Sequence, residues 1–193
     1  MTDKTGKVLV LSRGEVSSLL NMKEVLEVVE EAFKLLFEGK VIQPKKTQMY
    51  WGEEGRRITA LPCYVKQKVA GIKWLSYNSG NRKKGLPTIS AVLVLNDYET
   101  GVPICIMDAS RVTSMRTGAH AGVAAKYLAR RDSSILSIMG CGAEGRTHVE
   151  AMNELFKIRE VKIYDIFSEY AEKFADDIKT KLNLQVTIMD STV

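Results

Sequence analysis

Cysteine, histidine and long apolar runs are all scarce in this sequence of 193 residues. Its 3 cysteines stand far apart as Cys63, Cys105 and Cys141. Without a CxxC pair they indicate neither a zinc knuckle nor a disulfide framework. The presence of only 2 histidines argues against a histidine-based metal site. No apolar run approaches the roughly 20 residues of a membrane span. The polar segment Met1–Lys7 has no signal-peptide core. We therefore expect a cytoplasmic protein with no metal and no membrane partner.

The charge balance is mildly basic, with 28 Lys and Arg against 23 Asp and Glu. A nucleic-acid surface needs clustered cations, whereas here the densest cluster is the short run Arg82-Lys83-Lys84. We therefore expect no nucleic-acid partner. Hydrophobic residues make up 45% of the chain and charged residues 26%, which is typical of a globular protein and excludes a disordered or fibrous chain.

Before residue 131 the pattern predicts short strands framed by helices. Apolar residues at helical spacing predict a helix over Met22–Glu38 that ends at Gly39. Alternating runs between turn signals such as Gly52–Gly55 predict an antiparallel or mixed sheet. Its expected strands are Val8–Leu11, Lys46–Trp51, Arg57–Tyr64, Val69–Tyr77, Thr88–Asn96 and Val102–Asp108. Ser110–Arg130 reads as a helix so rich in small residues that another backbone can approach it closely.

After Asp132 strands alternate with helices, which predicts parallel βαβ units. The expected strands are Ile135–Met139, Glu160–Tyr164 and Leu184–Met189, and the helices are Glu144–Lys157 and Ser168–Leu182. A complete doubly wound domain has about six strands. We therefore expect an α/β protein in which an α+β substrate and dimerisation domain, with its linking helix, occupies residues 1–130. The first half of a Rossmann doubly wound domain follows in residues 131–193.

The first of these strands runs directly into a glycine motif of the form GxGxxG. Gly140 allows a tight turn, Gly142 leaves room for a pyrophosphate, and Gly145 lets the helix pack closely on the strand. Asp165 ends the second strand, 20 residues after Gly145, where a carboxylate accepts hydrogen bonds from the adenine ribose. Because that carboxylate repels a 2′-phosphate, the motif predicts NAD rather than NADP.

Three ordered motifs ahead of the glycine loop carry a family resemblance. Gly71–Ser76, Leu86–Ala91 and Thr113–Ala119 resemble the corresponding segments of the ornithine cyclodeaminase/μ-crystallin family, and the similarity extends from about Val8 onward. That family includes ornithine cyclodeaminases, an archaeal type of alanine dehydrogenase and ketimine reductases. The resemblance implies a subunit with a substrate domain and a Rossmann domain, assembled as a homodimer through the sheet of the first.

The resemblance also implies roles for individual residues. Lys73 matches the lysine that contacts the substrate carboxylate and the reacting centre, and is the candidate catalytic residue. Arg116 matches the arginine that clamps the substrate α-carboxylate. On the cofactor side the matching positions are Thr88 near the nicotinamide, Thr117, Gly140, Gly142, Ala143, Glu144, Gly145 and Asp165.

Two departures from the family pattern bear on function. Lys46 stands where the family commonly has an arginine that binds the substrate, so the charge is kept but the bidentate fork is lost. The catalytic aspartate of the family lies in the second half of the Rossmann domain, beyond residue 193. We therefore expect this chain to be truncated and not to turn over by itself.

The resulting hypothesis is NAD-dependent hydride transfer at the Cα of a small L-amino acid, giving an imino acid with loss of ammonia. Ornithine to proline is the default reaction of the family. Dehydrogenation of alanine or another amino acid, or reduction of a ketimine, is the alternative within the class. A non-catalytic, μ-crystallin-like ligand-binding protein is the alternative of another class.

Overall fold

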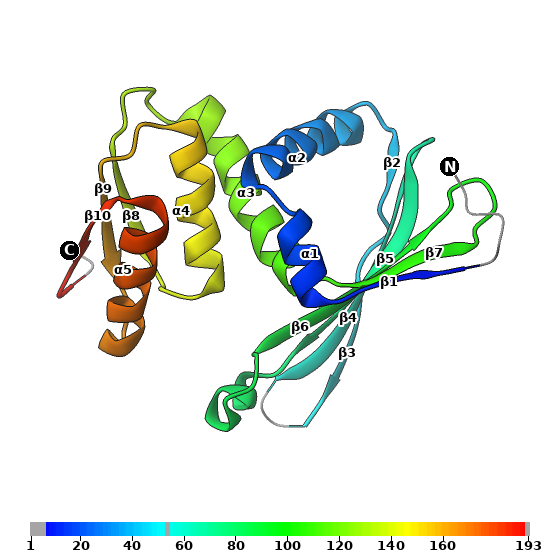
Figure 1. Cartoon of the computed structure of the whole chain (residues 1–193). Coiled ribbons are helices and arrows are strands. Elements are labelled where there is room, and N and C mark those ends of the chain that lie inside the picture. Colours follow the sequence, from blue (N-terminus) through cyan, green and yellow to red (C-terminus); the bar gives the residue numbers. More distant parts are fainter. Residues whose placement is uncertain (1–6, 53–54, 192–193) are drawn as a thin grey trace. The chain divides into compact units, whose positions relative to one another are not determined.

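The computed structural model describes residues 7–52 and 55–191, which form two compact units (Figure 1). The first unit comprises Met1–Leu20 and Ala32–Thr113, and the second comprises Asn21–Glu31 and Ser114–Val193. Glu53 and Glu54 of the predicted turn, and most of the polar segment Met1–Lys7, lie outside the described residues. The predicted division into a substrate domain and a cofactor domain at residue 130 stays a prediction.

A seven-stranded sheet forms the first unit. Its strands are β1 (Leu9–Leu11), β2 (Val41–Ile42), β3 (Thr47–Trp51), β4 (Arg56–Val65), β5 (Val69–Tyr77), β6 (Ile89–Asn96) and β7 (Pro103–Asp108). The order is β1-β7-β6-β5-β4-β2, and β3 also pairs with β4. Only β1 and β7 pair in parallel among these strands. The sheet is therefore mixed, as the sequence predicted.

The two faces of this sheet differ in burial. Paired residues share a face, so Cys105, Ala91 and Thr59, which are all buried, belong to one covered face. The opposite face exposes a set of apolar side chains at positions joined by the strand register. We call this set the open face; its members are Val10, Met49, Trp74, Val92 and Ile106.

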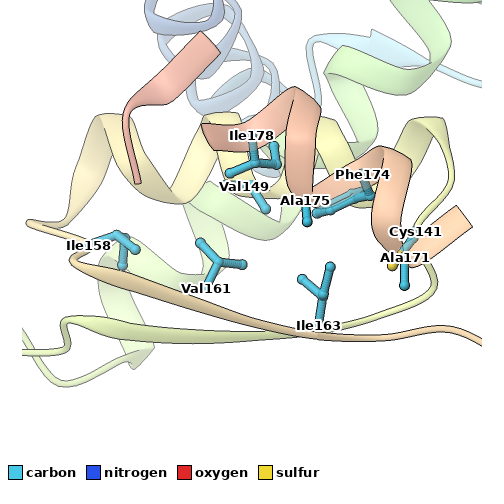
Figure 2. Close-up of a cluster of buried hydrophobic side chains, with 9 residues drawn as sticks. All are labelled: Cys141, Val149, Ile158, Val161, Ile163, Ala171, Phe174, Ala175 and Ile178. Atoms are coloured by element: carbon cyan, nitrogen blue, oxygen red, sulfur yellow. The ribbon is translucent and has the colours of Figure 1, made fainter. Parts of the chain in front are cut away.

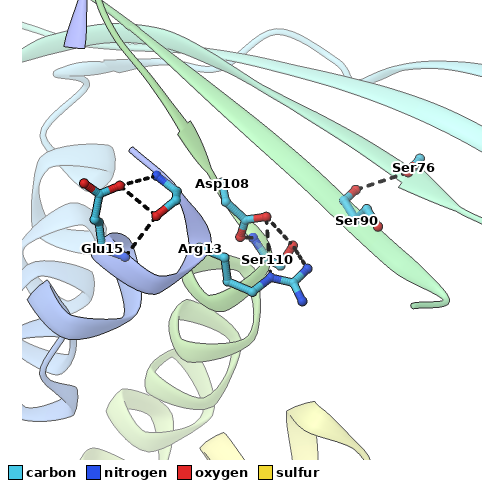
Figure 3. A network of polar contacts seen from close by, with 7 residues as sticks. Arg13, Glu15, Ser76, Ser90, Asp108 and Ser110 are labelled. Atoms are coloured by element: carbon cyan, nitrogen blue, oxygen red, sulfur yellow. Dashed lines mark hydrogen bonds and ion pairs between the residues drawn. The ribbon is translucent and has the colours of Figure 1, made fainter. Parts of the chain in front are cut away.

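Helix α1 (Arg13–Leu19) begins with a capping box formed by Ser12 and Glu15. The Ser12 hydroxyl and N–H contact the Glu15 carboxylate at 2.7 and 2.8 Å, and these hydrogen bonds hold the pKa of Glu15 below its ordinary value. Arg13 reaches Asp108 at the end of β7 (3.6 Å) and Ser110 (3.2 Å), as Figure 3 shows. This network fixes α1 to the end of the sheet.

Two helices divide their residues between the units. Helix α2 (Met22–Phe37) is followed by Gly39, which has φ +70 as a C-terminal stop requires. Helix α3 (Ser110–Leu128) begins in the first unit and continues into the second. In the part of the chain that the structure describes, no helix combines the length and the apolar character that crossing a bilayer requires.

The second unit contains a βαβαβ arrangement built on a parallel sheet of order β10-β9-β8. Its elements are β8 (Ile135–Met139), α4 (Ala143–Leu155), β9 (Glu160–Tyr164), α5 (Ser168–Leu182) and β10 (Gln185–Ile188). Helices α4 and α5 cover one face of the sheet, and Val149, Val161, Ile163 and Phe174 fill the core between them (Figure 2). This is the first half of a doubly wound domain, as predicted.

Helix α3 packs on α4 through its small residues, which confirms the close approach expected of them. A Cβ on Gly118 would lie 2.3 Å from the carbonyl oxygen of Thr147. A Cβ on Gly122 would lie 3.2 Å from the Cβ of Ala151. A side chain larger than hydrogen at Gly118 would clash with the backbone of α4, whereas at Gly122 it would first meet the Leu26 Cδ2 of α2, at 2.8 Å.

Candidate functional site

In the loop between β8 and α4, a different structural reason favours glycine at each of the three motif positions. Gly140 adopts φ +99, and its N–H bonds the carbonyl oxygen of Tyr164 over 2.9 Å. A Cβ on Gly145 would lie 2.4 Å from the carbonyl oxygen of Gly140, so only glycine lets the helix come so near the strand end. A Cβ on Gly142 would meet nothing within 4 Å. The first and third glycines therefore shape the loop, while the second leaves a space above it.

This open space lies at the beginning of helix α4. Gly142 is the N-cap residue and supplies no side-chain hydrogen bond to the first turn, which starts at Ala143 and Glu144. The first N–H groups of a helix have no partner within the helix, and together they carry a partial positive charge. A bare helix start beside an open glycine fits the pyrophosphate of a dinucleotide.

Asp165 lies immediately after β9 and is bonded to the loop. Its Oδ2 accepts the N–H of Cys141 over 2.7 Å, and its Oδ1 accepts the N–H of Phe167 over 3.0 Å. A carboxylate has about four lone-pair sites. Two bonds therefore leave it able to accept hydrogen bonds from ribose hydroxyls, as the sequence pattern predicts.

Cys141 shows why the thiol in the loop is not a nucleophile. The residue is 2% exposed, and its Sγ lies 3.8 Å from the carbonyl oxygen of Tyr164. Burial, helped by the negative charge of Asp165, raises the pKa of this thiol to about 11. A thiol with such a pKa stays protonated at neutral pH and is inert.

The residues of α3 are held against the element that starts at the glycine loop. The Thr147 hydroxyl of α4 lies 2.8 Å from the carbonyl oxygen of Ser114. Two residues further along α3, Arg116 is exposed, and Thr117 is half-buried beside it. The second unit thus holds Arg116, Thr117, the loop and Asp165 in one packed piece.

The other predicted site residues belong to the first unit. Lys73 is half-buried on β5, and its Nζ lies 3.5 Å from the Oγ1 of Thr113, a buried residue. Lys46 directly precedes β3, which is two strands away from β5 across β4. Thr88 directly precedes β6, and its carbonyl oxygen accepts the N–H of Asn78. Lys73 pairs with Leu93 of β6, which lies five residues after Thr88. Thr88 is therefore roughly 16 Å from Lys73 along the sheet.

Sequence reasoning missed two side chains of the loop's surroundings, Arg146 and Thr147. Both follow the last glycine of the motif, and both act through contacts with residues at least 31 positions away or with backbone oxygens. Within residues 7–52 and 55–191, no group of three His, Cys, Asp or Glu side chains is placed to hold a metal ion.

Comparison with known families decides the classification of this chain. Residues 7–193 match the model of the ornithine cyclodeaminase/mu-crystallin family. The chain belongs to this family. As a member, it shares 44% identity over 168 residues with the alanine dehydrogenase of Archaeoglobus fulgidus, a match that covers 87% of the chain and 51% of that enzyme.

Solved structures agree with this family fold. The Δ1-pyrroline-2-carboxylate reductase of Thermococcus litoralis, in complex with NADH and L-proline, superposes with a TM-score of 0.93 at 39% identity, covering 96% of this chain and 58% of the reductase. An archaeal alanine dehydrogenase dimer with bound NAD gives 0.88 at 40% identity, covering 94% and 56%. This family member spans about half the length of the relatives that it matches.

Proposed function

We propose that this chain binds NAD at the glycine loop and serves hydride transfer at the Cα of a small amino or imino acid. The observation that carries the proposal is the loop itself. Gly140 and Gly145 meet steric demands within the protein, whereas Gly142 faces open space at a helix start with Asp165 beside it. A tight turn without a ligand would need no glycine at that second position.

The chemistry of the predicted residues suits the roles that we propose for them. Asp165 holds the adenine ribose and disfavours a 2′-phosphate, while the N–H groups of Ala143 and Glu144 face the pyrophosphate. The exposed Arg116 offers a planar fork to the substrate α-carboxylate. Lys73 supplies an ammonium group suited to contacting a substrate and moving the proton of its amino or imino nitrogen. When bound, the nicotinamide supplies or accepts the hydride at Cα. The assignment of Thr88 and Thr117 to the cofactor side stays a prediction.

The substrate is the finer part of the proposal. Ornithine to proline is the default reaction of the family, and lysine at position 46 argues for a substrate held less rigidly than by an arginine fork. The relatives at 39–44% identity are an alanine dehydrogenase and an imino acid reductase. We therefore propose a dehydrogenase of small amino acids, or a reductase of cyclic imino acids, as alternatives to the cyclodeaminase.

A panel of reactions separates these outcomes. Net NADH formation from NAD and L-alanine indicates a dehydrogenase, and NADH consumption with pyrroline-2-carboxylate indicates a reductase. Release of ammonia and proline from L-ornithine without net change in NADH indicates a cyclodeaminase. In protein that also carries the second half of the Rossmann domain, NADH binding without turnover of any of them favours a ligand-binding protein, the alternative that the change at Lys46 supports. Absence of NADH binding in a calorimetric titration would contradict the proposal.

The proposed partner is a second copy of this chain, docked on the open face of the first unit. Trp74 is 49% exposed on β5, an inner strand of the sheet, and Val10 is 69% exposed on the edge strand β1. Contiguous apolar patches of this kind mark interaction surfaces. The archaeal alanine dehydrogenase relative is itself a dimer.

A further inference from the structure

Arg146, the first residue after the glycine motif, contacts the loop through its side chain. Its Nη1 donates to the carbonyl oxygen of Cys141 over 2.8 Å and lies 3.2 Å from that of Gly142. The two carbonyl groups belong to consecutive residues of the loop. One guanidinium therefore bonds two successive peptide groups, and the carbonyl oxygen of the second, Gly142, also accepts the backbone N–H of Arg146 over 3.3 Å.

The other side of the guanidinium is anchored to helix α5. Its Nε pairs with the Oδ2 of Asp177 over 2.9 Å, and its central carbon lies 5.0 Å from the ring centroid of Phe174. Phe174 is fully buried in the core of the second unit. The position of Arg146 is thus set by an ion pair and a ring stack, independently of the loop.

The direction of these carbonyl groups has a consequence for the neighbouring N–H groups. In a trans peptide the C=O and the N–H point in opposite directions. When the carbonyls of Cys141 and Gly142 turn toward Arg146, the N–H groups of Gly142 and Ala143 turn away from it. Carbonyl oxygens are thereby kept from a phosphate, which they would repel, and N–H donors are presented instead.

We propose that Arg146 is a positioning residue that sets the glycine loop for the pyrophosphate of a dinucleotide, with Asp177 holding Arg146 in place. This inference rests on the proposed cofactor function. Its weight falls on geometry rather than charge, because the Asp177 carboxylate offsets the positive charge of the guanidinium. Lysine carries the same charge but has no planar fork with which to bond Asp177 and the carbonyls together.

The test compares NADH affinity among R146M, R146K, D177N and a matched control, R159Q. Arg159 belongs to the same unit and bonds the Ser134 hydroxyl over 3.1 Å, away from the loop. We expect R146M and R146K each to raise the Kd for NADH about tenfold, as the loss of hydrogen bonds to a charged donor does. D177N should raise it about threefold, and R159Q should leave it within twofold. Titrations are run well below the melting temperature of each variant.

The outcomes separate a positioning role from a merely structural one. The inference is overturned if R146M has a lower melting temperature but NADH raises that temperature by as much as it does for the unchanged protein. Full recovery of affinity in R146K also overturns it, because charge alone would then suffice. If R146M does not fold, R146K and D177N decide by the same criteria. A chain that binds no NADH before any substitution overturns the proposed function and this inference together, whereas an unaffected R146M overturns this inference alone.

Discussion

The fully buried hydroxyl of Thr147 on α4 lies 2.8 Å from the carbonyl oxygen of Ser114 on α3. Thr147 follows the glycine motif by two residues, and Ser114 precedes Arg116 by two. The helix that begins at the candidate pyrophosphate site and the helix that carries the candidate carboxylate clamp are therefore joined at their nearest turns. Gly118 makes this joint possible by removing the side chain that would separate the helices.

The substitution G118A should destabilise the second unit. The new Cβ would lie 2.3 Å from the carbonyl oxygen of Thr147, and a backbone atom cannot move aside as a side chain can. Overpacking of this kind costs about 1–3 kcal/mol of the free energy of unfolding. The matched control is G14A on α1, where the nearest atom is the Ser12 Oγ at 3.9 Å. Urea denaturation should show a loss for G118A only, and equal midpoints would contradict the tight joint.

The substitution D165N should weaken NADH binding and reduce the preference over NADPH. The amide oxygen can still accept the N–H of Cys141, but the charge that favours ribose hydroxyls and repels a 2′-phosphate is gone. We expect about a tenfold higher Kd for NADH, from the loss of charge-assisted bonds. D176N, an exposed neighbour of the ion-paired Asp177, serves as the control. An unchanged ratio of the two dissociation constants would remove Asp165 from the cofactor site.

Stability should fall as the pH rises above 9, in part because of Cys141. Burial raises the pKa of its thiol from 9.0 to about 11. Between these values the unfolded chain releases this proton while the folded chain keeps it, so the free energy of unfolding decreases with pH. Melting temperatures from pH 8 to pH 11 should fall less steeply for C141A than for the unchanged protein. Parallel curves would show that the thiol does not contribute. Burial also raises the pKa of Cys63 and Cys105, so only the difference between the curves is informative.

A charge on the open face should prevent association of two copies. In W74E a carboxylate would replace an exposed indole near the middle of the sheet. We expect light scattering after size exclusion to give the mass of a dimer for the unchanged protein and of a monomer for W74E. L86E is the control, because Leu86 is an exposed apolar residue of the same unit outside the strands. A monomeric unchanged protein would exclude this partner.

The elements with strong local patterns were predictable from sequence. Val69–Tyr77, Ile135–Met139, Glu160–Tyr164 and Ser168–Leu182 have the bounds that their periodicity indicates. Two elements were missed. Strand β2 has only two residues and exists through its pairing with the end of β4. The 3-10 helix η1 (Ser79–Lys84) depends on the Asn78 side chain, which accepts the N–H of Gly80, in a stretch that reads as a turn.

The site divides in the same way. The roles of the glycines follow from their spacing, since each role is local to the turn. The role of Arg146 could not be predicted in this way, because it depends on an ion pair with Asp177, which lies on another helix 31 residues later. The only local signal is an arginine directly after the third glycine. In sequence, it cannot be told from an ordinary exposed arginine on a helix. The pairing between Cys141 and Asp165 is likewise invisible until strands β8 and β9 lie side by side.

That pairing constrains how this protein can be altered, by engineers or by evolution. The carboxylate that we propose selects the cofactor also accepts the N–H of Cys141, and so fastens the first peptide of the loop. Exchanging it for a small neutral or a basic residue, as a switch toward the phosphorylated cofactor requires, would release the loop at the same moment. A successful switch therefore needs a compensating acceptor for the Cys141 N–H, so that cofactor preference changes by a pair of substitutions rather than by one.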